Sequence, residues 1–280
     1  MIHVCTSLIN ALPFEWSHYA FMQHALLAVI LISPLFALLG CMVVNNQMAF
    51  FSDAIGHAGL TGIALGVIIG IANPLGAMIV FALGLAIVIT LLRRYSAASG
   101  DTTIGIVMSC TVAIGIVLLS RQGGFNRYTQ YLIGDLLSIT GSDLWMLTIV
   151  DALFALVWIF AFNKLFLVST SATLARSRGQ NVWLWQGFFA AITAVIVTIS
   201  IQWVGILVIN ALIILPASAA RIISRTNRQY IASAGLISLV CGICGLIASY
   251  YWSTATGATI VLFCMAAYVG LLVFARMRKL

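Results

Sequence analysis

Asp53 and His57 form an Asp-x-x-x-His pair in a chain whose 280 residues include only six acidic side chains and four histidines. A spacing of four residues places both side chains on one face of a helix. A carboxylate and an imidazole in this arrangement can bind a divalent cation together. The apolar run behind them, residues 54–71, is long enough to enter a bilayer, where ionisable groups are costly and indicate function. The alternative is that Asp53 caps its helix and His57 is an interfacial side chain.

The composition is that of a membrane protein. The chain is 63% hydrophobic and 7% charged, with a mean hydropathy of +1.15, whereas soluble domains carry about 25% charged residues. We therefore predict an all-α fold, a polytopic transmembrane helical bundle in which residues 1–280 form a single domain. The net charge of +7 does not indicate nucleic acid as a partner, because the basic residues lie in short clusters between apolar runs.

Eight or nine apolar runs approach the 17 to 25 residues, roughly, that cross a bilayer. The stretch 184–215 is too long for one straight crossing, and Gln202, Trp203 and Gly205 offer a break. The piece after this break is short for a full span, so both counts remain open. The predicted spans are 19–44, 53–71, 74–92, 103–120, 143–163, 182–203, 205–215, 230–252 and 256–274.

The second predicted span carries a helix-packing pattern. Gly62, Gly66 and Gly70 recur at every fourth position. Such glycines let two helix backbones approach closely in lipid, where there is no hydrophobic drive between helices. We predict close packing against a neighbouring helix, which says nothing about a substrate.

Basic residues predict the orientation, because cytoplasmic segments of membrane proteins are enriched in Lys and Arg. A cytoplasmic C-terminus and an odd number of crossings put the N-terminus outside. The inner side then holds Arg93, Arg94, Lys164, Arg176, Arg178, Arg221, Arg225, Arg228, Arg276, Arg278 and Lys279, and the outer side holds Arg121 and Arg127.

Asp143 and Asp151 are two further carboxylates within one predicted span. Asp143 lies near the outer end, and Asp151 lies about 12 Å deeper at the rise of an α-helix. A buried acid must be paired, protonated or facing water. Asp151 either attracts a cation in a wet vestibule or makes a helix-packing hydrogen bond or ion pair, for which Arg127 is one candidate partner.

A proline, four small residues and a basic stripe predict a short cytoplasmic helix. Proline is tolerated in the first turn of a helix, and Arg221, Arg225 and Arg228 would share one face of it. This helix can lie on anionic lipid headgroups or dock into a groove of a soluble partner. The small residues favour the protein partner. The residues of this predicted docking segment are Pro216, Ala217, Ser218, Ala219, Ala220, Arg221 and Arg225.

Motifs for catalysis are missing from the sequence. The only lysines, Lys164 and Lys279, do not follow a glycine, so there is no P-loop for nucleotide phosphates. Neither His-Glu-x-x-His nor Gly-x-Ser-x-Gly occurs. We predict that the chain is not an enzyme by itself.

Four stretches resemble the membrane subunits of zinc, manganese and iron ABC importers, the metal-chelate permease family. The likeness runs from about residue 21 to residue 274, although the loop 45–48 reads Asn-Asn-Gln-Met where relatives usually carry Arg or Lys. The stretches are Phe51-Ser-Asp-Ala-Ile-Gly-His-Ala-Gly-Leu, Ile104-Gly-Ile-Val-Met-Ser, Tyr131-Leu-Ile-Gly-Asp-Leu-Leu, and the segment from Val204 through Pro216-Ala-Ser-Ala-Ala to Arg221.

This resemblance implies a pore subunit in the plasma (inner) membrane of a prokaryote. Two copies would form the pore, two cytoplasmic ATP-binding subunits would dock at the segment after Pro216, and an extracytoplasmic protein would deliver the metal. Asp53 and His57 match the family's metal-gating positions. Zinc or manganese would be the transported substrate, with no bound cofactor, and two ligands do not choose between these metals and iron.

Three other classes of protein remain as alternatives. An ion-driven secondary metal transporter needs no ATPase, but such folds tend to show inverted repeats, and no internal repeat is visible here. An ABC permease for a metal chelate such as a siderophore needs no ionisable pair in its path. A membrane scaffold would not transport at all.

Overall fold

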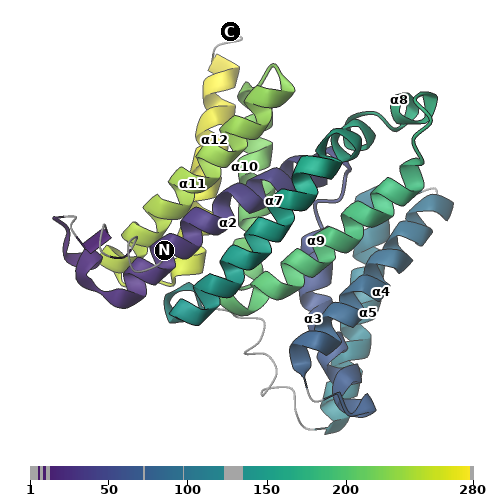
Figure 1. Ribbon diagram of the computed structural model, residues 1–280, viewed down its shortest axis with the longest axis horizontal. Coiled ribbons are helices and arrows are strands. Elements are labelled where there is room, and N and C mark those ends of the chain that lie inside the picture. Colours follow the sequence, from purple (N-terminus) through teal and green to yellow (C-terminus); the bar gives the residue numbers. More distant parts are fainter. Residues whose placement is uncertain are drawn as a thin grey trace. The chain divides into compact units, whose positions relative to one another are not determined.

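The computed structural model describes residues 6, 9–10, 13–71, 73–96, 98–122 and 135–277. Nine helices within these residues are long and apolar enough to cross a membrane, which confirms the predicted all-α transmembrane fold and the larger of the two counts (Figure 1). They are α2 (Ala20–Asn45), α3 (Phe51–Ile69), α4 (Pro74–Tyr95), α5 (Gly100–Gln122), α7 (Gly141–Thr170), α9 (Val182–Val204), α10 (Ile206–Ile223), α11 (Asn227–Trp252) and α12 (Thr256–Met277). Among the described residues, the short helix η1 (Glu15–His18) precedes α2, η2 (Leu136–Ser138) lies between α5 and α7, and α8 (Ala172–Ser177) lies between α7 and α9.

The predicted break in the stretch 184–215 is present. Helix α9 ends at Val204, and α10 begins at Ile206. Between them Gly205 has a φ of 80°, a conformation that glycine adopts without the steric cost paid by other residues. One residue therefore separates two helices, and the short piece becomes a span of its own because it continues past Pro216.

The chain forms two compact units whose sequences interleave. The first unit contains Met1–Cys41, Asp135–Leu156 and Trp203–Leu280, and the second contains Met42–Gly134 and Val157–Gln202. Helices α2, α7 and α9 contribute residues to both units.

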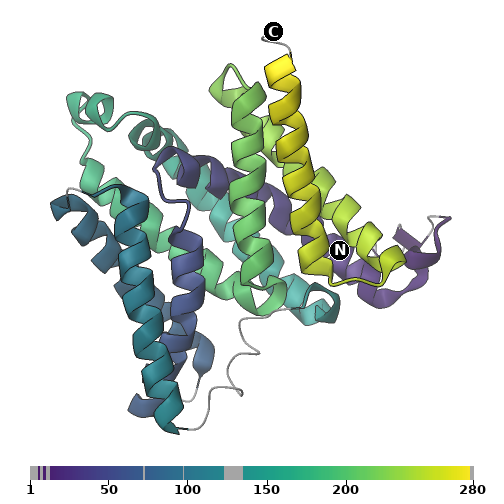
Figure 2. The same ribbon diagram turned by 180° about the vertical axis from the view of Figure 1, so that it is seen from behind.

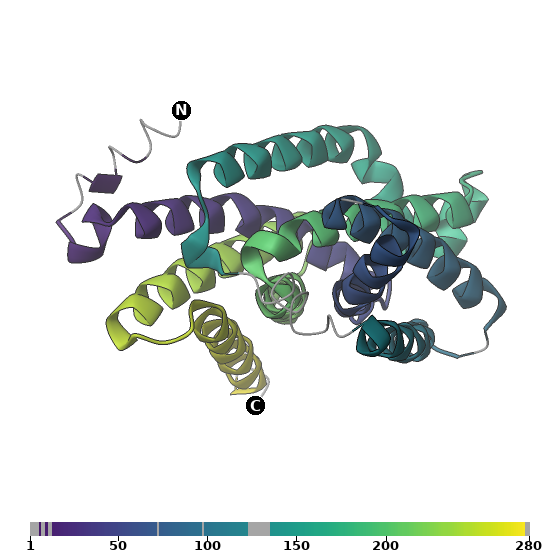
Figure 3. The same cartoon turned by 90° about the horizontal axis from the view of Figure 1, so that it is seen from below.

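In the first unit, α10, α11 and α12 pack against one another (Figures 1 and 2), and a short turn joins α11 to α12 (Figure 3). Glycines permit the closest approaches. A Cβ on Gly245 of α11 would lie 2.6 Å from the Cα of Ile260 on α12, and one on Gly40 of α2 would collide with the carbonyl oxygen of Ile213 on α10. These helices therefore meet backbone to backbone, as expected where dispersion contacts replace the hydrophobic effect.

In the second unit, α3 packs against both α4 and α5. A Cβ on Gly62 would lie 3.2 Å from the Cα of Met78, and one on Gly66 would collide with the Cβ of Ala77. These two glycines confirm the predicted close packing of the second span. Gly70 plays a different part, because it ends α3 with a φ of 84° and a Cβ there would meet nothing within 4 Å.

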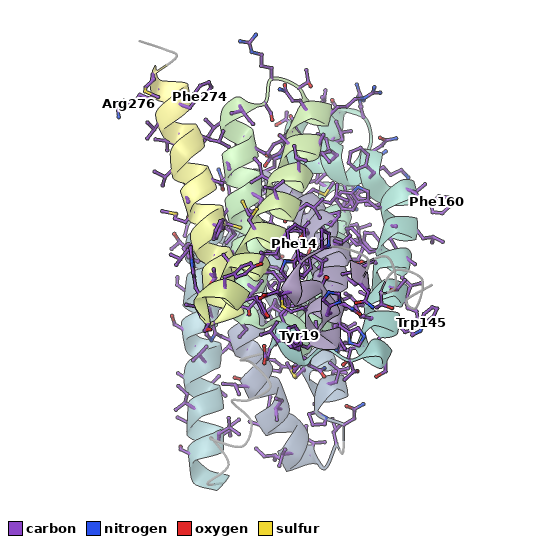
Figure 4. The ribbon with its side chains drawn as sticks, turned by 90° about the vertical axis from the view of Figure 1, so that its left-hand side faces the viewer. Phe14, Tyr19, Trp145, Phe160, Phe274 and Arg276 are labelled. Carbon is purple, nitrogen blue, oxygen red and sulfur yellow. The ribbon has the colours of Figure 1, made fainter. Side chains whose placement is uncertain are left out.

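Helix α7 presents a long apolar face outward. Figure 4 shows Trp145 and Phe160 projecting from it, and they are 52% and 79% exposed. Exposed apolar residues recur every three or four positions, as on a helix with one lipid-facing side. They are Trp145, Met146, Ile149, Leu153, Leu156, Ile159 and Phe160.

The prediction that a separate helix begins at Pro216 is wrong. Helix α10 runs without interruption from Ile206 to Ile223, with Pro216 inside it. Proline removes one backbone hydrogen bond, but helices in membranes tolerate this where neighbouring helices pack around the site, and Pro216 is buried. The prediction that Arg221, Arg225 and Arg228 share one helix face is also wrong. Arg221 lies in the last turn of α10, Arg225 follows the helix, and Arg228 belongs to α11.

Substituting Gly40 tests the backbone contact between α2 and α10. We expect Gly40→Ala to lower the free energy of unfolding by about 1–3 kcal/mol, because its methyl group overpacks against a main-chain carbonyl. Thermal unfolding of the purified protein in detergent measures this effect. Gly84→Ala is the matched control, since a Cβ at this α4 position meets nothing within 4 Å. Equal melting temperatures for the two variants would contradict the proposed packing.

Candidate functional site

Asp53 and His57 lie in the first two turns of α3. The Nε2 atom of His57 is 3.4 Å from Oδ1 of Asp53, and the side chains are 42% and 28% exposed, respectively. The predicted pair is therefore brought together on one helix face, with an oxygen and a nitrogen within reach of one small cation.

The pair lies on the one accessible stripe of an otherwise buried helix segment. Between residues 51 and 64, only Asp53, His57 and Leu60 are not buried. These three positions follow one another at i, i+4 and i+7, so they share a single side of α3. Within its own unit, the two side chains therefore lie on the side of α3 that the packed helices leave partly exposed.

The start of α3 is held by charged residues from two other helices. The guanidinium of Arg93, at the end of α4, donates from Nη2 to the carbonyl of Asn46 at 2.8 Å. The carboxylate of Asp101, in the first turn of α5, accepts from the backbone N–H of Phe50 at 3.4 Å. These contacts fix the loop 46–50 that leads into α3. They therefore also fix where Asp53 lies along the length of the neighbouring helices α4 and α5.

Further along α3, the hydroxyl of Thr61 donates to the carbonyl of Thr111 on α5 at 2.7 Å. Together with the glycine contacts to α4, this bond fixes the rotation of α3 about its axis. Because rotation decides which side of α3 is accessible, these contacts position His57 as well as Asp53. The sequence prediction missed Arg93 and Asp101 as positioning residues. Their only signal was a charged residue at the end of an apolar run for Arg93 and before one for Asp101.

The Asp53–His57 pair offers too few donor atoms to form a complete metal site by itself. No group of three or more His, Cys, Asp or Glu side chains gathers among the described residues. Zinc in proteins takes four ligands, and the oxygen and nitrogen donors here suit zinc or manganese. Asp53 and His57 can therefore bind a divalent ion loosely, and a firmer site needs ligands from outside this set.

Asp143 and Asp151 have different surroundings. Asp143, in the first turn of α7, accepts from the backbone N–H and the hydroxyl of Thr140 at 2.9 and 2.6 Å. Its other oxygen accepts from the indole N–H of Trp203 at 3.1 Å. This carboxylate therefore ties the start of α7 to the end of α9.

Asp151 lies on the side of α7 that carries the buried residues Leu147 and Phe154, away from the lipid-facing stripe. Its Oδ1 atom is buried and has no hydrogen-bond partner among the described residues. Arg127, the partner considered from the sequence, lies outside those residues. A carboxylate oxygen in this setting must be protonated or meet water or a cation.

The predicted docking segment is only partly accessible. Ala217, Ala219 and Ala220 are buried within the chain, so their small side chains serve the packing of α10. Arg221 and Arg225 are exposed. Any soluble partner that docks here meets the basic side chains first.

Comparison with known proteins identifies the class. Residues 18–275 match the ABC 3 transport family, so the chain belongs to this family of ABC transporter membrane subunits. With nine apolar spans among its described residues, it is a multi-pass membrane protein.

Individual relatives support the same assignment. The chain is 33% identical over 255 residues to the high-affinity zinc uptake system membrane protein ZnuB of Haemophilus influenzae, covering 91% of this chain and 97% of that protein. It is 31% identical over 245 residues to the manganese transport system membrane protein MntC of Listeria monocytogenes, covering 87% of each. Among solved structures it resembles a chain of PsaBC from Streptococcus pneumoniae in complex with Fab, with a TM-score of 0.76, 26% identity, and coverage of 97% of this chain and 95% of that chain.

Proposed function

We propose that this protein is the pore-forming subunit of an ATP-driven importer of divalent metal ions, zinc or manganese. The observation that carries the proposal is the Asp53–His57 pair on the accessible stripe of α3. The relatives named for zinc uptake and for manganese transport support the substrate class. In this proposal residues 1–280 act as one permease domain to which both compact units contribute.

Two copies of the chain form the pore. Each copy offers one carboxylate and one imidazole, so two copies facing each other through α3 supply the four ligands that a tetrahedral zinc site needs. Between residues 51 and 64, all side chains except those of Asp53, His57 and Leu60 are buried. This supports the arrangement, because only these three residues are left to face a second copy or a water-filled path.

Loose binding suits transport. An ion in transit must be bound well enough to enter and weakly enough to leave. A metal site shared by two copies meets both conditions, because its affinity depends on the distance between the Asp53–His57 pair of one copy and that of the other. The ion is bound when the two pairs are close and is released when they move apart. Tight capture of the metal is then the task of an extracytoplasmic binding protein, and no bound cofactor is required.

ATP hydrolysis belongs to a partner chain in this proposal. The sequence contains no P-loop, so ATP binds to another chain in this proposal. Two cytoplasmic ATP-binding subunits dock near the end of α10, where Arg221 and Arg225 are exposed. The chain itself is not an enzyme.

The proposed orientation places the N-terminus outside and the C-terminus in the cytoplasm. The loop 45–48 carries no basic residue, so its sequence does not assign it to either side of the membrane. The hydrogen bond from Arg93 to Asn46 supports an inner position, because it brings a basic residue of the adjacent α4 to this loop.

Removing either ligand tests the transit site. We expect Asp53→Ala and His57→Ala each to abolish metal uptake in the reconstituted complex while expression and assembly continue, because one remaining donor per copy cannot hold the ion. Leu60→Ala is the matched control, since it alters the same stripe without removing a metal-binding atom. Normal uptake by either ligand variant at limiting metal would show that the pair is structural.

Asp151→Asn tests the proposal that this residue attracts the cation in a vestibule, together with Asp143. The substitution keeps the shape and hydrogen-bonding capacity of the side chain but removes its charge. We expect a higher metal concentration for half-maximal uptake at an unchanged melting temperature. An unchanged uptake curve would assign Asp151 to helix packing, and a lowered melting temperature with unchanged uptake would do so as well.

Charge reversal tests the docking of the ATP-binding subunit. We expect Arg221→Glu combined with Arg225→Glu to detach or uncouple this subunit, because two exposed attractive charges become repulsive toward an acidic partner surface. Co-purification and uptake measure the two effects. Arg276→Glu, an equal change of charge at the exposed end of α12, is the control. The docking proposal fails if the double variant keeps both co-purification and uptake.

A further inference from the structure

A basic pocket lies in the second unit, lined by the end of α4 and by the turn from α8 into α9. The ribbon diagrams show these elements at one end of the unit (Figures 1 and 2). The volume of the pocket is about 570 Å³. The described residues that line it include Arg93, Arg94 and Arg176 and no Asp or Glu, and the amide-bearing residues Gln180, Asn181 and Gln186 also line it. The pocket is therefore positively charged and rich in hydrogen-bond donors.

The wall formed by α8 is a built element of the fold. Ser171 caps α8 by accepting from the backbone N–H of Leu174. Ala175 of α8 packs in a small buried cluster with Val168 of α7 and Val182 of α9. These contacts hold a helix of under two turns in a defined place, and with it the backbone position of Arg176.

Two of the three arginines make contacts with other groups of the chain. Arg93 is already engaged, since it donates to the carbonyl of Asn46. The guanidinium of Arg94 lies 5.8 Å from the ring centre of Trp183 and 5.6 Å from that of Tyr95. An arginine over an aromatic face keeps its planar fork of N–H groups available for a phosphate. Arg94 and Arg176 are therefore the two groups best able to bind an anion.

Apolar surface continues from the pocket along the same two helices. Toward the middle of the spans, Ile87 and Leu91 of α4 and Leu184 and Phe188 of α9 are exposed. This is the pattern expected at the level of lipid headgroups: arginine and tryptophan lie at the end of a span, and exposed apolar side chains follow. A soluble phosphate would use the arginines but would not need this apolar surface.

We propose that this pocket binds the phosphate headgroup of an anionic phospholipid, whose acyl chains lie along the exposed faces of α4 and α9. Arg94 and Arg176 bind the phosphate oxygens, and the amides of Gln180 and Gln186 bind the remaining headgroup oxygens. Basic pockets between transmembrane helices are suited to such headgroups, since each basic side chain adds to the attraction. The site is separate from metal transit and goes beyond the proposed function.

Native mass spectrometry of the purified full-length protein tests the proposal, with phosphatidylglycerol and phosphatidylcholine of the same acyl chains as probes. We expect phosphatidylglycerol to be retained preferentially, and Arg94→Gln combined with Arg176→Gln to weaken its binding by at least about tenfold. Arg178→Gln is the matched control, because Arg178 is an exposed arginine two residues beyond Arg176 that does not line the pocket. Arg93 is left intact because it also holds the loop before α3.

Several results would overturn the proposal. The proposal fails if the wild-type protein retains phosphatidylglycerol and phosphatidylcholine equally. It also fails if the double variant still prefers phosphatidylglycerol. If the double variant does not fold, Arg176→Gln alone, at an exposed position, decides the matter in the same way. Thermal protection by inorganic phosphate equal to that by phosphatidylglycerol would assign the pocket to a soluble anion. Loss of the ATP-binding subunit with unchanged lipid retention would assign it to a protein contact.

Discussion

A carboxylate and an imidazole can be kept within an apolar span only if protein, rather than lipid, surrounds the helix that carries them. Within one chain, helix α3 meets this requirement on every side but one, because all residues between 51 and 64 are buried except Asp53, His57 and Leu60. In the proposed pore, that remaining side faces a second copy or a water-filled path. The close glycine contacts to α4 and the hydrogen bond from Thr61 to α5 follow from the same requirement. Membrane helices gain little from burying apolar surface, so this helix is enclosed by close backbone approach and by a few polar bonds.

The helices were largely predictable because the bilayer imposes a length and a composition that the sequence shows directly. The errors occurred where a local rule was applied without its tertiary context. The predicted span 143–163 stops before Lys164, yet α7 continues to Thr170, and the ammonium of Lys164 lies 5.2 Å from the ring centre of Trp185. The sequence predicts that Pro216 begins a helix, yet Pro216 lies within α10, where packing around it compensates for the missing N–H.

The candidate site was predictable only in part, for a physical reason. The spacing of Asp53 and His57 is a local property, so it is visible in the sequence. Which side of α3 stays accessible depends on contacts with α4 and α5, which no local pattern encodes. The same holds for Arg93 and Asp101, whose partners Asn46 and Phe50 lie far away in the sequence. The four sequence motifs already predicted the transporter class, which the family match confirms, and the geometry supplied the accessible stripe.

The interleaving of the two units has a consequence for biogenesis. The first unit joins the beginning of the chain to its end, so α2 finds its neighbour α10 only after more than half of the protein has been synthesised. Until then, the face of α2 that holds Val29, Ile32 and Phe36, all fully buried in the finished fold, has to rest against lipid or the insertion machinery. Membrane insertion and final packing are thus separate events in time. A chain that terminates before α10 would leave its first span without this neighbour, a state that cellular quality control can recognise.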